Sequence, residues 1–169
     1  VSMTAPCPPK MLLPVPGETR ARVTPSARLT AMVDASGLTD GTTSWLVVDY
    51  AKALDCSQLN CLAGIAPDNA DLFELNQVLV GNLRYAAEAL SKEGIRLLIE
   101  PINTLDIPGF FLNRTEQAAQ IVADVGSHNL FIQYDIYHMQ IMEGDIARTL
   151  QKHLGRIAHV QLADNPGRN

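Results

Sequence analysis

The chain has 169 residues, of which 47% are apolar, so it is long enough to bury one sizeable core. Its net charge of −5 argues against nucleic acid as the main partner, because surfaces that bind nucleic acid are usually basic. No apolar run reaches the roughly 20 residues of a membrane-spanning helix, and the first residues lack the pattern of a secretory signal, so we expect no membrane partner.

Residues 1–44 differ in composition from the rest of the chain. Six of the ten prolines occur before Ser26, and the first aromatic residue is Trp45. Because proline opposes both helix interiors and central strands, and no helical or strand period is visible, this composition predicts an irregular or disordered arm. Within it, 10–15 has only weak strand character. We therefore divide the chain into this arm and an ordered domain over 45–169.

The ordered domain begins with a helix, a strand and a second helix. Residues 45–54 have the pattern of the end of a helix, and 58–63 that of a short buried strand. The second helix is predicted over 71–90, where Asp71 can cap the first turn. Apolar residues recur there at intervals of three and four, as one buried stripe requires, namely Leu72, Leu75, Leu79, Leu83, Ala86 and Leu90.

The three cysteines, Cys7, Cys56 and Cys61, are odd in number and show no zinc-site spacing. The simplest interpretation is that they are reduced thiols in a cytoplasmic protein. Cys61 lies in the predicted strand, and we expect it to pack there as a small hydrophobic side chain.

Strands and helices continue to alternate in the second half of the chain. Short apolar segments predict strands over 95–100, 129–135 and 157–162. Helical patterns separate them at 113–125 and 143–154. The spacing between strand starts is that of βαβ units, in which parallel strands are joined by helices.

The helix at 113–125 carries its own end signals, because Asn113 can cap its start and Gly126 can end it. The whole alternation predicts an α/β fold with a parallel sheet, either a doubly wound open sheet or a TIM barrel. No glycine-rich phosphate turn follows any predicted strand, which argues against nucleotide binding.

Polar side chains able to bind a metal stand at or near the ends of three predicted strands: Glu100, Asp135 and Gln161. In a parallel sheet these ends lie at one edge, and in a barrel they converge on the mouth, where catalytic residues lie. Two carboxylates and an amide oxygen are hard ligands that suit Mg²⁺ or Mn²⁺. One such residue alone is more often a helix cap or a solvated loop residue, but three successive strands with this feature favour a metal site.

Five segments of the ordered domain have sequences that point to a known family. They are Asn82-Leu83-Arg84-Tyr85-Ala86-Ala87, Leu98-Ile99-Glu100-Pro101-Ile102-Asn103, Asp106-Ile107-Pro108-Gly109-Phe110, Ile132-Gln133-Tyr134-Asp135-Ile136-Tyr137-His138-Met139-Gln140 followed by Met142-Glu143-Gly144, and His159-Val160-Gln161-Leu162-Ala163-Asp164-Asn165-Pro166-Gly167-Arg168. Together they closely resemble bacterial members of the hydroxypyruvate isomerase family, which belongs to the xylose-isomerase-like TIM barrels. The resemblance runs over about 49–168.

The resemblance implies a partial TIM barrel of about four parallel strands with intervening helices. It implies an isomerase that interconverts hydroxypyruvate and 2-hydroxy-3-oxopropanoate (tartronate semialdehyde) through a metal-stabilised enediolate. Glu100 matches a catalytic acid/base and metal-side carboxylate, and Asp135 and Gln161 match further metal ligands. His138 matches a substrate-side histidine, although a loop histidine bonded to the backbone is the alternative. We also consider Arg168 as a contact for a substrate carboxylate.

Part of the family pattern is not found in this sequence. The family has strands before the one at 58–63, and after Gln161 a final strand that carries a second catalytic glutamate. Without these strands we expect unpaired sheet edges, which favour a homo-oligomer, an open sheet or aggregation, and we expect impaired activity. Two further functions stay open: a related oxo-acid isomerase or ketose epimerase, and a non-catalytic remnant that serves as an assembly unit.

Overall fold

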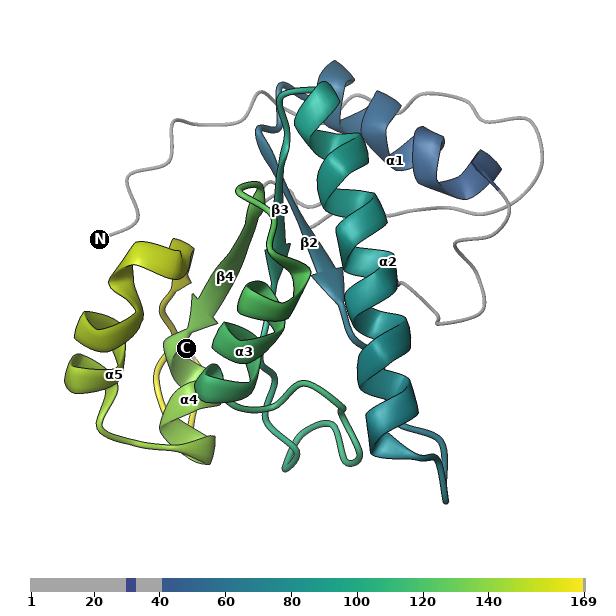
Figure 1. The fold of residues 1–169 in the computed structure, drawn as a ribbon. Helices are drawn as coiled ribbons and strands as arrows, with labels where there is room; N and C mark the ends of the chain where they lie inside the picture. Colours follow the sequence, from purple (N-terminus) through teal and green to yellow (C-terminus); the bar gives the residue numbers. More distant parts are fainter. Residues whose placement is uncertain (1–29, 33–40, 169) are drawn as a thin grey trace.

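The computed structural model of the protein describes residues 30–32 and 41–168 (Figure 1). Its elements, in chain order, are β1 (Thr30–Met32), α1 (Gly41–Ala53), β2 (Gln58–Leu62), α2 (Leu72–Lys92), β3 (Arg96–Ile99), α3 (Thr115–Val125), β4 (Leu130–Asp135), α4 (Ile136–Met142), α5 (Ile146–His153), a 3₁₀ turn (Leu154–Arg156) and β5 (Ile157–Gln161). Within these described ranges, no helix has both the length and the apolar character needed to cross a membrane.

The strands form one parallel sheet in the order β1-β2-β3-β4-β5. Each strand therefore lies beside its neighbour in the sequence, and a helix lies within each connection. This is the order of consecutive strands in a TIM barrel, because a doubly wound sheet reverses its strand order at a switch point. The expected partial barrel is confirmed, and β1 raises the strand number from about four to five. α2 and α3 pack side by side and cover one face of the sheet (Figure 1).

The described part of 1–44 departs from the predicted irregular arm at two places. Thr30–Met32 forms β1, which pairs in parallel with β2, and α1 begins at Gly41, before the predicted boundary. A strand of three residues is too short to produce a recognisable alternation in the sequence. The other residues of this segment, including the weak strand prediction at 10–15, lie outside the described residues.

α2 is capped as predicted, but its first turn lies outside the core. Oδ1 of Asp71 accepts hydrogen bonds from the backbone N–H groups two and three residues later, at 2.8 and 3.3 Å. Leu83 and Leu90, further along the predicted stripe, are buried. Leu72 at the start of the stripe is 64% exposed, because this end of α2 extends past the ends of the strands (Figure 1).

The start of α3 differs from its predicted capping. The N-cap position is Arg114, without a side-chain cap, and the predicted cap Asn113 bonds carbonyls of the preceding loop. Glu143, from the end of α4, takes the role instead: its Oε1 accepts the backbone N–H of Thr115 at 2.6 Å and its Oε2 accepts the Thr115 hydroxyl at 2.8 Å. The predicted end at Gly126 is confirmed by its left-handed φ of 69°.

The core lies between the sheet and the two helices α2 and α3. It is built from buried apolar side chains of these elements, among them Leu83, Leu97, Ile99, Ile121 and Ile132. Cys61 joins it as expected, and burial raises the pKa of its thiol to about 12. Because β3 and β4 are buried along most of their length, the residues that end them are held in fixed positions.

Candidate active site

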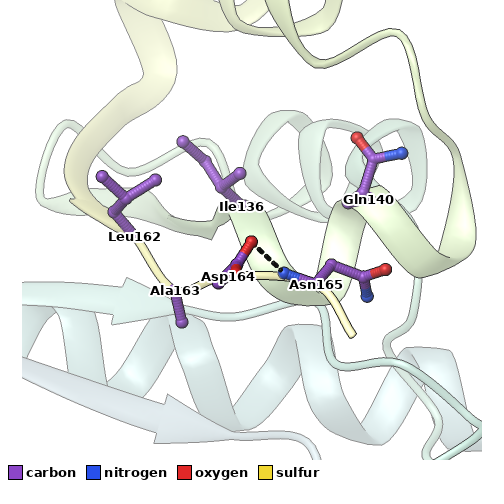
Figure 2. Close-up of a pocket in the computed structure, with 6 residues that line it drawn as sticks. All are labelled: Ile136, Gln140, Leu162, Ala163, Asp164 and Asn165. Carbon is purple, nitrogen blue, oxygen red and sulfur yellow. Dashed lines mark hydrogen bonds between the residues drawn. The ribbon is translucent and has the colours of Figure 1, made fainter. Parts of the chain in front are cut away.

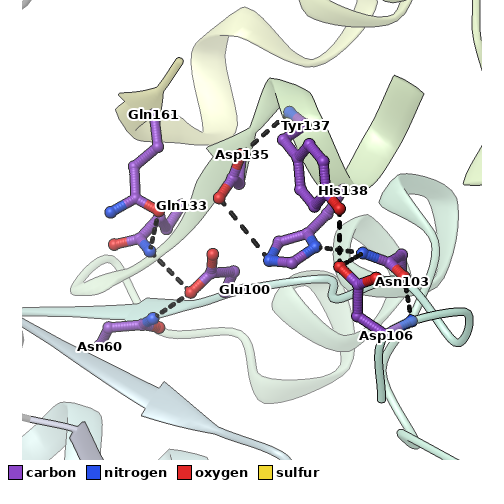
Figure 3. A network of polar contacts seen from close by, with 9 residues as sticks. All are labelled: Asn60, Glu100, Asn103, Asp106, Gln133, Asp135, Tyr137, His138 and Gln161. Carbon is purple, nitrogen blue, oxygen red and sulfur yellow. Dashed lines mark hydrogen bonds and ion pairs between the residues drawn. The ribbon is translucent and has the colours of Figure 1, made fainter. Parts of the chain in front are cut away.

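Glu100, Asp135 and Gln161 stand at the carboxyl ends of three neighbouring strands. Glu100 follows the last residue of β3, and the other two are the last residues of β4 and β5. The parallel register pairs Asp135 directly with Gln161, so all three lie at one edge of the sheet (Figure 3). Glu100 and Asp135 are each only 2% exposed, so the protein withdraws both carboxyl groups from water.

Two amide side chains hold the carboxyl group of Glu100. Its Oε2 accepts a hydrogen bond from Nδ2 of Asn60 at 2.6 Å and another from Nε2 of Gln133 at 2.7 Å. The same Nε2 donates to Oε1 of Gln161 at 3.1 Å. Gln133 lies two residues before Asp135 in β4, so both side chains point to the same face of the sheet. Gln133 therefore connects the end of β3 to the end of β5.

Asp135 and His138 come together because β4 continues directly into α4, a helix that the sequence patterns did not predict. Oδ1 of Asp135 accepts the backbone N–H of Tyr137 at 2.9 Å and so caps this helix. One turn along, Nε2 of His138 lies 3.6 Å from Oδ2 of Asp135. With Glu100, these two residues form a buried group in which one ligand atom from each lies within 4.8 Å of the others.

A second polar group borders His138 on its Nδ1 side (Figure 3). Nδ2 of Asn103 lies 2.7 Å from Nδ1 of His138. Oδ2 of Asp106 accepts a hydrogen bond from the same Nδ2 at 3.1 Å and one from the Tyr137 hydroxyl at 2.8 Å. These bonds, first that from Asn103 and then that from Tyr137, lower the pKa of Asp106, and the bond to Asp106 raises the pKa of Tyr137.

The structure brings four of the five predicted site residues into one connected group: Glu100, Asp135, His138 and Gln161. The fifth, Arg168, is exposed and does not enter the group. Its guanidinium carbon lies over the ring of Tyr137, 4.8 Å from the ring centroid, so this side chain borders the second polar group from outside.

Asn60, Gln133 and Asp106 are the site residues that sequence reasoning missed. Asn60 and Gln133 are polar residues inside short strands that are otherwise largely apolar and buried, which is an unusual position for an amide. That signal could have indicated both residues. Asp106 lies in an exposed loop where a carboxylate has no such distinction.

The donor set fits a divalent cation. Two buried carboxyl groups lie close together, and negative charge at such positions is stabilised by a bound cation. Gln161, which pairs with Asp135 across the sheet, places an amide oxygen at the same strand ends, where its Oε1 accepts a hydrogen bond from Gln133. Carboxylate and amide oxygens are the ligands that Mg²⁺ and Mn²⁺ prefer, and the buried ring of His138 lies beside the two carboxyl groups.

A separate hollow of about 580 Å³ lies between α4 and the segment after β5 (Figure 2). Its lining residues are Ile136, Gln140, Leu162, Ala163, Asp164 and Asn165. None of the residues that line it belongs to the group around Glu100. Two of the lining residues, Ile136 and Leu162, directly follow Asp135 and Gln161, so the hollow adjoins the ends of β4 and β5.

Comparisons with known proteins find one matching family and relatives that are named isomerases. The family described as xylose isomerase-like TIM barrel matches residues 46–169. The hydroxypyruvate isomerase of Escherichia coli strain K12 is 52% identical over 121 residues, which are 72% of this chain and 47% of that protein. The 2-oxo-tetronate isomerase of Cupriavidus necator is 40% identical over 122 residues, with the same two coverages. The chain therefore spans about half the length of these relatives.

A solved structure agrees with these sequence matches. The crystal structure of an AP endonuclease, family 2, from Brucella melitensis superimposes with a TM-score of 0.69 and 38% identity, covering 73% of this chain and 49% of that chain. The resemblance that the sequence motifs indicated is confirmed by the matching family and by the isomerase relatives.

Proposed function

The chain belongs to the xylose isomerase-like TIM barrel family, and on that premise we propose that it serves as an isomerase of small keto acids or sugars. The preferred reaction is the interconversion of hydroxypyruvate and 2-hydroxy-3-oxopropanoate. The observation that supports this most is the buried group at the strand ends, in which Glu100 and Asp135 lie with His138. The 52% identity to a protein named hydroxypyruvate isomerase supports the choice of substrate.

The reaction moves a proton between two adjacent carbons of the substrate, and Glu100 is the proposed acid/base. A carboxylate can take a proton from one carbon and leave an enediolate, which the same carboxyl group reprotonates at the other carbon, while the hydroxyl proton passes from one substrate oxygen to the other. Asn60 and Gln133 both donate to Oε2 of Glu100, so this carboxyl group has a fixed orientation. Its near-complete burial excludes water that would otherwise compete for the proton.

Glu100, Asp135 and Gln161 are the proposed ligands of a divalent cation, either Mg²⁺ or Mn²⁺. When bound, such a cation would stabilise the negative charge that develops on the substrate oxygens. His138 is the proposed hydrogen-bonding partner of a substrate oxygen. Arg168, at the rim of the site, is the proposed contact for the substrate carboxylate, because a guanidinium can bind a carboxylate with two parallel hydrogen bonds.

A second candidate is the isomerisation of a longer oxo acid. The relative named 2-oxo-tetronate isomerase is 40% identical over a similar stretch, and the same proton transfer would serve both substrates. The thiols of Cys56 and Cys61 are free, which supports the further proposal of a reducing, cytoplasmic environment for either reaction.

An activity assay tests the proposed function. The purified chain is incubated with hydroxypyruvate and with 2-oxo-tetronate, with Mn²⁺, Mg²⁺ or EDTA, and the products are followed by chromatography. We expect slow, metal-dependent turnover of hydroxypyruvate that Glu100→Gln abolishes. Gln151→Glu, an amide-to-acid control on the exposed face of α5, should leave the rate unchanged. Turnover that persists in EDTA and in the Glu100→Gln variant would overturn the proposal. Faster turnover of 2-oxo-tetronate than of hydroxypyruvate would favour the second candidate.

A further inference from the structure

The orientation of the Asn103 side-chain amide follows from its partners. Asn103 is fully buried, and its Oδ1 lies 2.7 Å from the backbone nitrogen of Asp106. A backbone N–H can only donate, so the atom facing it must be the amide oxygen. Nδ2 in turn lies 3.1 Å from the carboxylate Oδ2 of Asp106, which accepts. The reversed amide would place a donor against a donor and an acceptor against an acceptor.

This orientation decides which nitrogen of His138 accepts a hydrogen bond. The second hydrogen of the Asn103 amide points to Nδ1 of His138, 2.7 Å away. An amide nitrogen has no acceptor capacity, so Nδ1 must supply its lone pair. A neutral imidazole carries one proton, which is therefore on Nε2. That nitrogen is on the side of the ring facing Asp135, 3.6 Å from its Oδ2 (Figure 3).

We infer that Asn103 is a positioning residue that holds neutral His138 in the tautomer protonated at Nε2, so that His138 donates a hydrogen bond to the substrate and is not a ligand of the cation. A metal binds the lone pair of a ring nitrogen. Here the lone pair of Nδ1 is taken by Asn103 and Nε2 carries the proton. The cation is then left to the oxygens of Glu100, Asp135 and Gln161. The substrate role, but not the tautomer, rests on the proposed function.

The position of Asn103 is itself fixed from two directions. Asp106 bonds both ends of its amide, within one turn of the loop that follows β3. Asp106 also accepts the hydroxyl of Tyr137 at 2.8 Å. Tyr137 and His138 are adjacent in α4, so the same helical turn that carries the imidazole also anchors the loop that orients it. The loop and the helix therefore cannot shift independently without breaking one of these bonds.

Nitrogen-15 NMR of the histidine rings tests the tautomer directly. The chain is labelled with ¹⁵N-histidine, and long-range ¹H–¹⁵N spectra are recorded at a pH of about 8, where an ordinary histidine is neutral. His138→Gln identifies the His138 signals by their loss. In the wild-type chain we expect the shift of an unprotonated nitrogen for Nδ1 and of a protonated one for Nε2.

The double variant Asn103→Asp, Asp106→Asn exchanges the side-chain amide and the carboxylate of these two residues. Its net charge is that of the wild-type chain, and the side-chain volumes are nearly the same. A carboxylate at 103 can only accept, so it calls for a proton on Nδ1, and we expect the tautomer of His138 to reverse. Gln151→Glu is the matched control and should keep the wild-type pattern. A merely structural role for Asn103 would leave the tautomer unchanged in the double variant.

These experiments can contradict the inference about Asn103 and the proposed function independently of each other. A protonated Nδ1 in the wild-type chain, or no reversal in a folded double variant, would overturn the inference. If the double variant does not fold, the wild-type spectrum still decides the tautomer, and Asn103→Ala, which removes the donor to Nδ1, decides the role of Asn103: an unchanged tautomer preference in that variant would overturn the inference. Because the spectra need no turnover, a correct tautomer in a chain that isomerises neither substrate would uphold the role of Asn103 and count against the proposed function.

Discussion

Nε2 of Gln133, in β4, donates a hydrogen bond to Oε2 of Glu100, at the end of the neighbouring strand β3, at 2.7 Å. Gln133→Leu keeps a side chain of similar size and removes this donor. Because the proposed ligand Glu100 then loses one of its two orienting bonds, we expect the affinity for Mn²⁺ to fall about 10- to 100-fold. Isothermal titration calorimetry measures this, with Gln151→Leu on the surface of α5 as the control. Equal affinities in the two variants would contradict the positioning role of Gln133.

His138 should be needed for turnover but not for metal binding. If the cation is held by oxygens, His138→Gln keeps the Mn²⁺ affinity of the wild-type chain. The loss of the imidazole donor should lower kcat by a factor of about 100. Parallel calorimetry and product assays make the comparison. A parallel loss of Mn²⁺ affinity would instead identify His138 as a ligand.

Glu143 should stabilise the fold from outside the site. Its two carboxylate oxygens accept the backbone N–H and the hydroxyl of Thr115, and Thr115 is only 1% exposed. Glu143→Ala leaves these buried groups with poorer partners, so we expect a loss of about 1–3 kcal/mol in the free energy of unfolding. Urea denaturation followed by circular dichroism measures it. Glu74→Ala, at an exposed position in α2, should cost less; equal losses would refute the capping role.

Cys61 should resist thiol reagents in the folded chain. Burial raises its pKa from 9.0 to about 12, so the reactive thiolate is scarce at pH 9, whereas the half-buried Cys56 should react first. Since folding raises this pKa, the related stability is complete below pH 9 and is lost as the pH rises from 9 towards 12. Alkylation at pH 9 with peptide mass spectrometry tests the order of reaction. Rapid native labelling of Cys61 would show that the strand is not buried.

The alternation of strands and helices could be predicted from the sequence because each element is indicated by residues that lie close together in the chain. The apolar period of α2, the apolar segments of β3 and β4, and the glycine at 126 each act within a few residues. α4 could not be predicted in this way. The strand runs into it without a loop, and Asp135 serves as both the last strand residue and the helix cap. A single carboxylate with two structural roles leaves no separate signal for the helix.

The candidate site could be predicted only as far as strand ends define it. Glu100, Asp135 and Gln161 each close a strand, and parallel pairing places such ends together. The bonds from Asn60 and Gln133 to Glu100 depend on which residues of neighbouring strands face each other. That register is set by packing across the sheet, which no local pattern records.

The number and affinity of Mn²⁺ ions bound by the chain test the central claim most directly. Electron paramagnetic resonance counts free Mn²⁺ in titrations of the wild-type chain and of Glu100→Gln, Asp135→Asn and Gln161→Leu, with Gln151→Leu as the control. We expect one site, weakened more than about tenfold by each of the three changes and unaffected by the control. Wild-type affinity in all three variants would contradict a cation shared by the three strand ends.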